Sequence, residues 1–265
     1  MPLSWSQDTV GPLTRTVRDC ARMTQVIAGA DPRDATCATL PVPDYEKELK
    51  GNIRGLRIGV PENHYYDGAT DDVRACMTAS LKVLKKLGAQ IIRVRVPDPG
   101  QIFLLSSTVS ISEASVIHRK WMRERPQDYS LYVRSRIEPG YHIPATAYIE
   151  ALNLRAYYLD EFMRKVYAKI DVLHTPVMVA PPPTIAETEP RASGDVAGIV
   201  ARITRNTRPT NYLGLPALSV PAGFSDNGLP IAFQLMGRPF SESLLFRAAH
   251  LYQQETDWHT RVPSL

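Results

Sequence analysis

The segment "LRIGVPENHYYDGATDDVRACMTASLKVLKKLGAQIIRVRV" (Leu56–Val96) decides the fold. Its first five residues predict a short buried strand, and apolar residues recur at helical spacing from Asp71 until Gly88 ends the run. The last residues alternate between apolar and polar, as a strand with one buried face does. Two strands joined by a helix of this length run parallel. The segment therefore predicts a parallel β–α–β unit.

The flanking sequence adds three strands to this unit. "DVLHTP" (171–176) predicts a strand that stops before the prolines at 181–183, which cannot continue sheet pairing. Further strands are expected at Ala217–Val220 and Ile231–Met236, with a tight turn at "SDNG" between them. The fold class is thus α/β: a mixed sheet flanked by helices in a single domain, residues 1–265.

The expected helices cover most of the rest of the chain. One is capped by Thr14 and stops at Gly29, and another has Ser241 as its N-cap. The range 101–137 predicts at least two helices broken at Pro126, and 145–170 predicts one long helix.

Composition excludes several function classes. The net charge is +4, but basic residues are interspersed with acidic ones, so no nucleic-acid partner is expected. No apolar stretch approaches the roughly 20 residues that cross a bilayer, and the start has no basic leader. The 3 cysteines form no CxxC pair, which indicates reduced thiols and a cytoplasmic location. The 6 histidines lie far apart, so neither a metal nor another cofactor is expected.

Three segments carry a resemblance to a known family. They are "SWSQDTVGPLTRTVRDCARMTQVIAGADPRD" (4–34), "DVLHTPVMVAPPPT" (171–184) and "NYLGLPALSVPAGFSDNGLPIAFQLMGRPFSESLL" (211–245). Together and in this order they resemble the C-terminal half of the amidase signature family, over essentially the whole chain. The resemblance implies that fold, and hydrolysis of the amide bond of a small molecule by a serine nucleophile, a bridging serine and a lysine base.

The catalytic residues that the resemblance implies are not expected in this chain. The family's glycine-serine loops precede the segment that resembles residues 2–12, and no Gly-Gly dipeptide occurs here. Ser106 and Ser107 have no glycine nearby and are predicted to lie on the face of a helix. We therefore expect no catalytic residue, and no activity of the chain alone.

Several functional interpretations stay open on the sequence. The chain can be an amidase shortened by a misassigned start, a truncation or cleavage. It can be a non-catalytic remnant, or half of a split amidase that binds a catalytic partner chain. An amidotransferase subunit of the A type is a further alternative. A hydrolase with a different nucleophile would need Ser, His and Asp to converge, and no GxSxG elbow is present.

The resemblance also suggests substrate-binding residues. Arg136, in "YVRSRIEPG", corresponds to an arginine that contacts substrate in the glutamine-dependent amidotransferase branch, and a guanidinium suits a carboxylate. Thr204, seven residues before Asn211, stands where that branch has an aspartate for the substrate's amino group. A neutral threonine cannot pair with an ammonium as a carboxylate does. This difference argues against glutamine as substrate and favours a general amidase.

Two further residues are candidates for the substrate site. Thr207 corresponds to a position that lines the acyl channel in other branches, with a helix-end cap as the alternative. His174 lies at the end of the third strand, where α/β enzymes place functional groups, with a buried core histidine as the alternative.

Half of such a sheet would leave a strand edge and an apolar face uncovered. We therefore expect a homodimer or a partner chain, and a small-molecule amide as substrate once the missing half completes the site.

Overall fold

The computed structural model describes residues 2–189 and 196–262, and in them five strands form one mixed sheet. The strands are β1 (Arg57–Pro61), β2 (Gln90–Val94), β3 (Val172–Pro176), β4 (Ala217–Phe224) and β5 (Pro230–Met236). Their order is β2-β1-β3-β5-β4. β1 is parallel to both β2 and β3, whereas β5 is antiparallel to both β3 and β4. The predicted mixed sheet, including its β–α–β unit, is confirmed.

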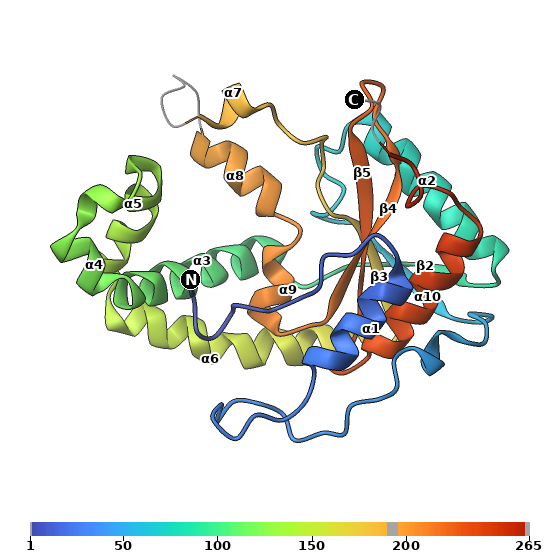
Figure 1. Ribbon diagram of the computed structural model, residues 1–265, viewed down its shortest axis with the longest axis horizontal. Helices are drawn as coiled ribbons and strands as arrows, with labels where there is room; N and C mark the ends of the chain where they lie inside the picture. The colour runs from blue at the N-terminus through green and yellow to red at the C-terminus, as the bar shows by residue number, and fades with distance from the viewer. Residues whose placement is uncertain (1, 190–195, 263–265) are drawn as a thin grey trace.

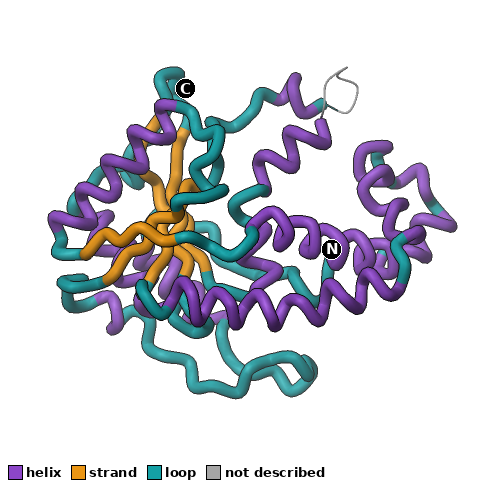
Figure 2. The backbone as a smooth tube through the Cα atoms, turned by 180° about the vertical axis from the view of Figure 1, so that it is seen from behind, coloured by secondary structure: helices purple, strands orange, loops and turns teal. Residues whose placement is uncertain are grey.

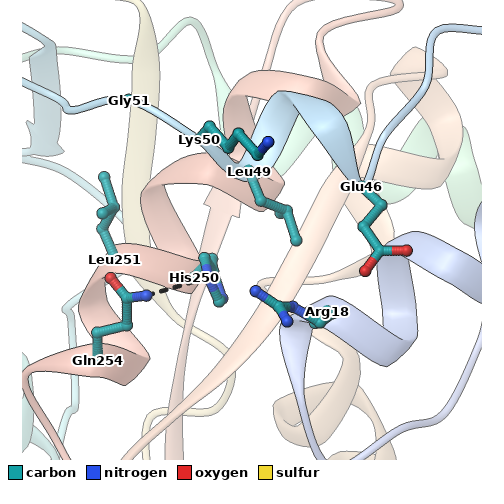
Figure 3. Close-up of a pocket in the computed structure, with 8 residues that line it drawn as sticks. All are labelled: Arg18, Glu46, Leu49, Lys50, Gly51, His250, Leu251 and Gln254. Atoms are coloured by element: carbon teal, nitrogen blue, oxygen red, sulfur yellow. Dashed lines mark hydrogen bonds between the residues drawn. The ribbon is translucent and has the colours of Figure 1, made fainter.

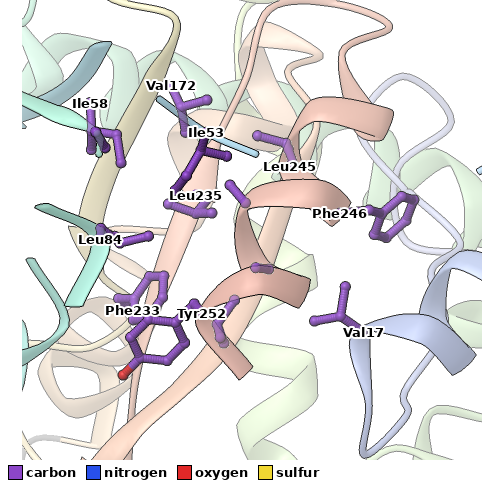
Figure 4. Packing of buried hydrophobic residues seen from close by; sticks show 14 of the residues in the cluster. Val17, Ile53, Ile58, Leu84, Val172, Phe233, Leu235, Leu245, Phe246 and Tyr252 are labelled. Carbon is purple, nitrogen blue, oxygen red and sulfur yellow. The ribbon is translucent and has the colours of Figure 1, made fainter. Parts of the chain in front are cut away.

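Helices cover both faces of the sheet (Figure 1). On one face lie α1 (Val17–Ile27), α2 (Asp71–Lys86) and α10 (Glu242–Gln254), and their buried side chains share a hydrophobic cluster with β1, β3, β4 and β5. Figure 4 shows this cluster, with Phe233 and Leu235 of β5 beside Tyr252 of α10.

A second hydrophobic cluster lies on the other face. It joins β2, β3 and β5 to α3 (Pro99–Ile117), α6 (Ala145–Glu161) and α9 (Arg208–Leu213). Figure 2 shows the long helices of this side reaching away from the sheet, with α4 (Arg119–Glu124) and α5 (Leu131–Ile137) at their far end. Two further α-helices in the described residues are α7 (Ile185–Thr188) and α8 (Val196–Thr204), and short 3-10 helices lie at Lys47–Leu49, Pro126–Asp128 and Glu138–His142.

Details of several helices differ from the sequence prediction. The cap of α1 is Thr16 rather than Thr14: its hydroxyl accepts the backbone N–H of Asp19 at 3.1 Å, while the Thr14 hydroxyl donates to the Thr16 carbonyl. Ser241 does occupy the N-cap position of α10, but its hydroxyl donates to the Arg238 carbonyl and caps nothing. The helix predicted for 145–170 is α-helical only to Glu161 and continues as a π-helical segment to Tyr167.

One helix in the described part of the chain, α3, has the length and the apolar composition to cross a membrane. The sequence patterns did not predict this. In the structure Ile102, Leu105 and Val109 of α3 are buried in the second cluster, against residues of α6 and α9. Leu104 and Val116 of the same helix are exposed, so the described fold buries α3 only in part.

The aromatic side chain of Phe233 should contribute strongly to the free energy of unfolding through its contacts in the first cluster. It is fully buried, contacts the Tyr252 ring edge-on at a centroid distance of 5.0 Å and stacks on His174 at 4.7 Å. Phe233→Ala should lower the free energy of unfolding by about 3–5 kcal/mol, because a large cavity remains. Urea denaturation monitored by circular dichroism measures this difference. The control Ile185→Ala removes an exposed side chain of α7 and should change stability little; equal effects of both changes would contradict the packing described.

Candidate functional site

A buried carboxylate holds the N-terminal segment against α3. Glu113 of α3 accepts the Ser4 hydroxyl at 2.5 Å and the Ser6 backbone N–H at 3.1 Å, and its other oxygen accepts the Tyr148 hydroxyl at 2.9 Å. Burial raises the pKa of Glu113, but these hydrogen bonds outweigh burial and hold the pKa below its ordinary value. The side chain therefore stays ionised although it is only 4% exposed.

The next residue of that segment, Gln7, connects it to two helices. The Ser106 hydroxyl of α3 donates to Gln7 Oε1 at 2.8 Å, and Gln7 Nε2 donates back to the Ser106 carbonyl. Asn211 of α9 donates through Nδ2 to the Gln7 carbonyl at 3.0 Å. Two segments that carry the family resemblance, 4–34 and 211–245, thus meet here although they are about 200 residues apart.

The junction between α8 and α9 connects to the third segment that carries the family resemblance, residues 171–184. Asn206, 1% exposed, donates through Nδ2 to the carbonyls of Tyr65 at 3.0 Å and Pro176 at 2.9 Å. Gln234 of β5 donates through Nε2 to the Asn206 carbonyl at 2.8 Å. Because Pro176 ends β3, the junction is fixed at the carboxyl end of that strand, where α/β folds place their sites.

The predicted residues Thr204 and Thr207 flank this junction. Thr204 is the last residue of α8, and its hydroxyl donates to the Val200 carbonyl at 2.9 Å. Thr207 is at the N-cap position of α9, but its hydroxyl donates to the Thr204 carbonyl at 3.3 Å rather than capping the helix. Both are half-buried, and their roles in substrate binding stay predictions.

The residue after Thr207 is a cation that was not predicted from the sequence. Arg208 donates through Nη1 to the Ser107 hydroxyl of α3 at 2.6 Å, and its guanidinium lies over the Phe103 ring, 4.6 Å from the centroid. Burial lowers the pKa of Arg208, and the positive charge of Arg136 lowers it further. The only signal in the sequence was its place next to Thr207, because its partners Phe103 and Ser107 lie about 100 residues away.

The predicted Arg136 belongs to the same region. It is an exposed residue of α5, and its guanidinium lies 5.7 Å from the centroid of the Tyr132 ring. It forms no ion pair within the part of the chain that the structure describes. Besides burial, the charge of Arg136 helps to lower the pKa of Arg208, and Arg208 directly follows Thr207 in the chain. We name the group Arg136, Arg208, Ser107 and Phe103 the two-arginine site.

His174 lies apart from the two-arginine site, in the first cluster. It is fully buried: its Nε2 shares a hydrogen bond with the Ser80 hydroxyl at 2.9 Å and its Nδ1 one with the Tyr66 hydroxyl at 3.2 Å. Burial lowers its pKa to about 3. Ser80 is also fully buried, so this serine–histidine pair has no access to substrate. The geometry is that of a core histidine with both ring nitrogens bonded.

A surface cavity of about 440 Å³ lies elsewhere, between α1, the 46–51 segment and α10 (Figure 3). Arg18, Lys50 and His250 line it, and none of the predicted site residues does. Across residues 2–189 and 196–262, no group of three His, Cys, Asp or Glu side chains is placed to hold a metal ion.

Known proteins match this chain over nearly its whole length, including the three segments that meet in the fold. The amidase family model matches residues 1–246, and the chain belongs to that family. It is 39% identical to an amidase of Pseudomonas putida over 99% of this chain. It is 36% identical to the A-type subunit of the glutamyl-tRNA(Gln) amidotransferase of Roseiflexus castenholzii over 98% of this chain. In both cases it spans only 56% of the relative's own length.

Solved structures show the same fold. A vestigial complex that reveals the origins of an s-triazine catabolic enzyme superposes with a TM-score of 0.81 at 27% identity, covering 96% of this chain and 55% of that one. The A-type subunit of the glutamyl-tRNA(Gln) amidotransferase of Thermotoga maritima gives 0.77 at 30% identity, covering 96% and 54%. The predicted family and fold are thus confirmed, and the chain spans about half the length of the relatives it matches.

The buried His174 gives a testable pH dependence. An unfolded histidine binds a proton below its ordinary pKa of 6.5, whereas the folded His174 stays neutral down to a pKa of about 3. The unfolded state therefore gains protons first, and the free energy of unfolding falls as the pH drops below 6.5. From about pH 6.5 to about pH 5.5 this group should remove about 1 kcal/mol.

Urea denaturation at both pH values, with His174→Gln and the exposed His142→Gln as a matched control, measures the effect. The His174 variant should lose this part of the pH dependence, and the control should keep it. An unchanged pH dependence in His174→Gln would show that the histidine is not buried in its neutral form.

Proposed function

We propose that this chain forms the substrate-facing half of an amidase that hydrolyses the carbon–nitrogen amide bond of a small molecule. The observation that carries the proposal is the extent of the match: nearly all of the chain corresponds to a little over half of the Pseudomonas putida amidase. The nucleophilic serine, the bridging serine and the lysine that the family resemblance implies would be supplied by the other half.

The chemistry of the described hydroxyl groups supports this division. A serine hydroxyl becomes a nucleophile only with a base within hydrogen-bond reach. In the ranges 2–189 and 196–262 no serine is hydrogen-bonded to a lysine, and Ser80, which has a histidine, is inaccessible. Ser106 and Ser107 are on α3, as predicted, and bond Gln7 and Arg208. We therefore assign no step of bond cleavage to these residues.

The other half would cover apolar groups that this chain exposes. Val10 and Leu13 are 86% and 98% exposed, and Trp5 is 65% exposed, all on the N-terminal segment. Val26 of α1 is exposed as well. β4 has β5 as its only strand neighbour in the described sheet, so its other edge keeps unpaired backbone groups. We propose that the remaining half of the amidase fold packs here.

A second candidate function is that of the A-type component of an amidotransferase, since several relatives bear that name. Thr204, in place of a carboxylate, argues against it, because a neutral hydroxyl cannot pair with an ammonium group and no described acidic side chain is hydrogen-bonded to Thr204. A non-catalytic remnant is the third candidate.

Complementation tests the proposal. This chain would be co-expressed with the half of the Pseudomonas putida amidase that it does not match, and ammonia release would be measured with aryl, aliphatic and carboxylate-bearing amides and with glutamine. The isolated chain should release none. The assembled complex should hydrolyse at least one amide, and should lose this activity when the nucleophilic serine of the added half is changed to alanine.

Two results would overturn the proposal. One is hydrolysis by the isolated chain. The other is a one-to-one complex that hydrolyses none of the amides while the parent amidase does. Release of ammonia from glutamine alone would favour the amidotransferase component.

A further inference from the structure

We propose that the surface cavity between α1, the 46–51 segment and α10 binds the phosphate group of a small organic molecule. The inference goes beyond the proposed function and does not rest on it. It concerns Arg18, Lys50 and His250, which line this cavity and which we do not assign to the amide substrate.

The cavity has the size and the lining of a ligand site. Its volume of about 440 Å³ lies within the range of about 300–1,000 Å³ that is usual for small-molecule sites. Leu49 and Leu251 give the lining an apolar part, and Arg18, Lys50 and His250 give it a basic part. Figure 3 shows the side chains of Arg18 and His250 pointing toward one another. A ligand between them would contact helices α1 and α10 together.

The two cations of the cavity have no counter-charge of their own. The acids of the neighbouring 44–48 segment already pair with other cations: Asp44 with Lys47 at 2.7 Å, Glu46 with Arg22 at 2.7 Å, and Glu48 with Arg247 at 2.6 Å. Glu46 lines the cavity, but both of its carboxylate oxygens accept hydrogen bonds from Arg22. Arg18 and Lys50 form neither a hydrogen bond nor an ion pair across residues 2–189 and 196–262. An anion in the cavity would therefore gain two cations without breaking an ion pair.

His250 adds an uncharged donor to the two cations. Gln254 Nε2 lies 3.3 Å from His250 Nε2, and because an amide N–H can only donate, this ring nitrogen accepts. The proton of the neutral ring is then on Nδ1, which has no hydrogen-bond partner in the described part of the chain. Burial lowers the pKa of His250, and the positive charge of Arg18 lowers it further, which favours this neutral form.

The arrangement suits a phosphate better than a carboxylate. Arg18, Lys50 and His250 belong to three different elements, so their N–H groups reach the cavity from different directions. The oxygens of a phosphate can accept from several directions, whereas a planar carboxylate is matched by one guanidinium fork. A phosphate monoester carries a charge of about −1.5 to −2 at neutral pH, which two cations balance. Leu49 and Leu251 would contact its organic part.

Isothermal titration calorimetry of the 265-residue chain with phenyl phosphate tests the inference. Phenyl phosphate should bind saturably. Inorganic phosphate lacks the apolar group and benzoate lacks the phosphate, so each should bind at least about 10-fold more weakly. At about 100 times its Kd, phenyl phosphate should raise the melting temperature by about 5 °C, because it binds the folded state alone.

Substitutions locate the binding in the cavity. Arg18→Gln and Lys50→Gln should each weaken binding of phenyl phosphate about 10-fold, since a charge-assisted hydrogen bond is lost. Both side chains are exposed, so these variants should fold as the parent chain does. The matched controls Arg15→Gln and Lys47→Gln remove the same charges from neighbouring positions that do not line the cavity. They should change binding less than about 2-fold.

Three results would overturn the inference. One is the absence of saturable binding of phenyl phosphate. Another is equal weakening by Arg18→Gln and Arg15→Gln, which would show an effect of net charge rather than a site. The third is binding of inorganic phosphate or benzoate as tight as that of phenyl phosphate. Failure of the proposed function is a separate result, because a chain whose complemented form hydrolyses no amide can still bind phenyl phosphate through Arg18 and Lys50.

Discussion

The position of the candidate site depends on the side-chain amide of Asn206. One Nδ2 group donates to two carbonyls, those of Tyr65 and Pro176, and the Asn206 carbonyl accepts from Gln234. The loops after β1 and β3 and the start of α9 are thereby held together at one end of the sheet. The arrangement has a cost, since Asn206 Oδ1 is buried without a partner in the described chain. Thr207 follows directly, so the amide also positions the residue at the start of α9 that the resemblance predicts for the substrate pocket.

The second constraint comes from the N-terminal segment. Residues 4–7 form no helix or strand, yet Ser4 and Gln7 are buried because Glu113, Ser106 and Asn211 satisfy their polar groups. This network reaches α3, which also carries Phe103 and Ser107 of the two-arginine site. One helix thus links the segment that would meet the other half of an amidase to Arg208. The N-terminal segment and the start of α9 are therefore both hydrogen-bonded to α3.

The fold could be predicted from the sequence where local pattern and packing agree. All five strands of the described sheet were expected within a few residues, because their apolar runs are bounded by glycine, proline or Asn-Gly. α7, α8 and α9 were missed. α7 and α9 have only four and six residues, so their stability depends on tertiary contacts rather than on a local signal. The cap at Thr16 was assigned to Thr14 because both are threonines before the same apolar stripe.

The candidate site includes one residue that could not be predicted from the sequence. Arg136, Thr204 and Thr207 were predicted from the family resemblance. Arg208 was not, because its partners Ser107 and Phe103 lie about 100 residues earlier in the chain and contact it only in the fold. Thr204 and Thr207 show the same limit from the other side: resemblance singled them out, but in the fold their hydroxyls bond the Val200 and Thr204 carbonyls of their own chain segment. Resemblance can therefore nominate positions, whereas the hydrogen-bond partners of each side chain follow only from contacts between distant parts of the chain.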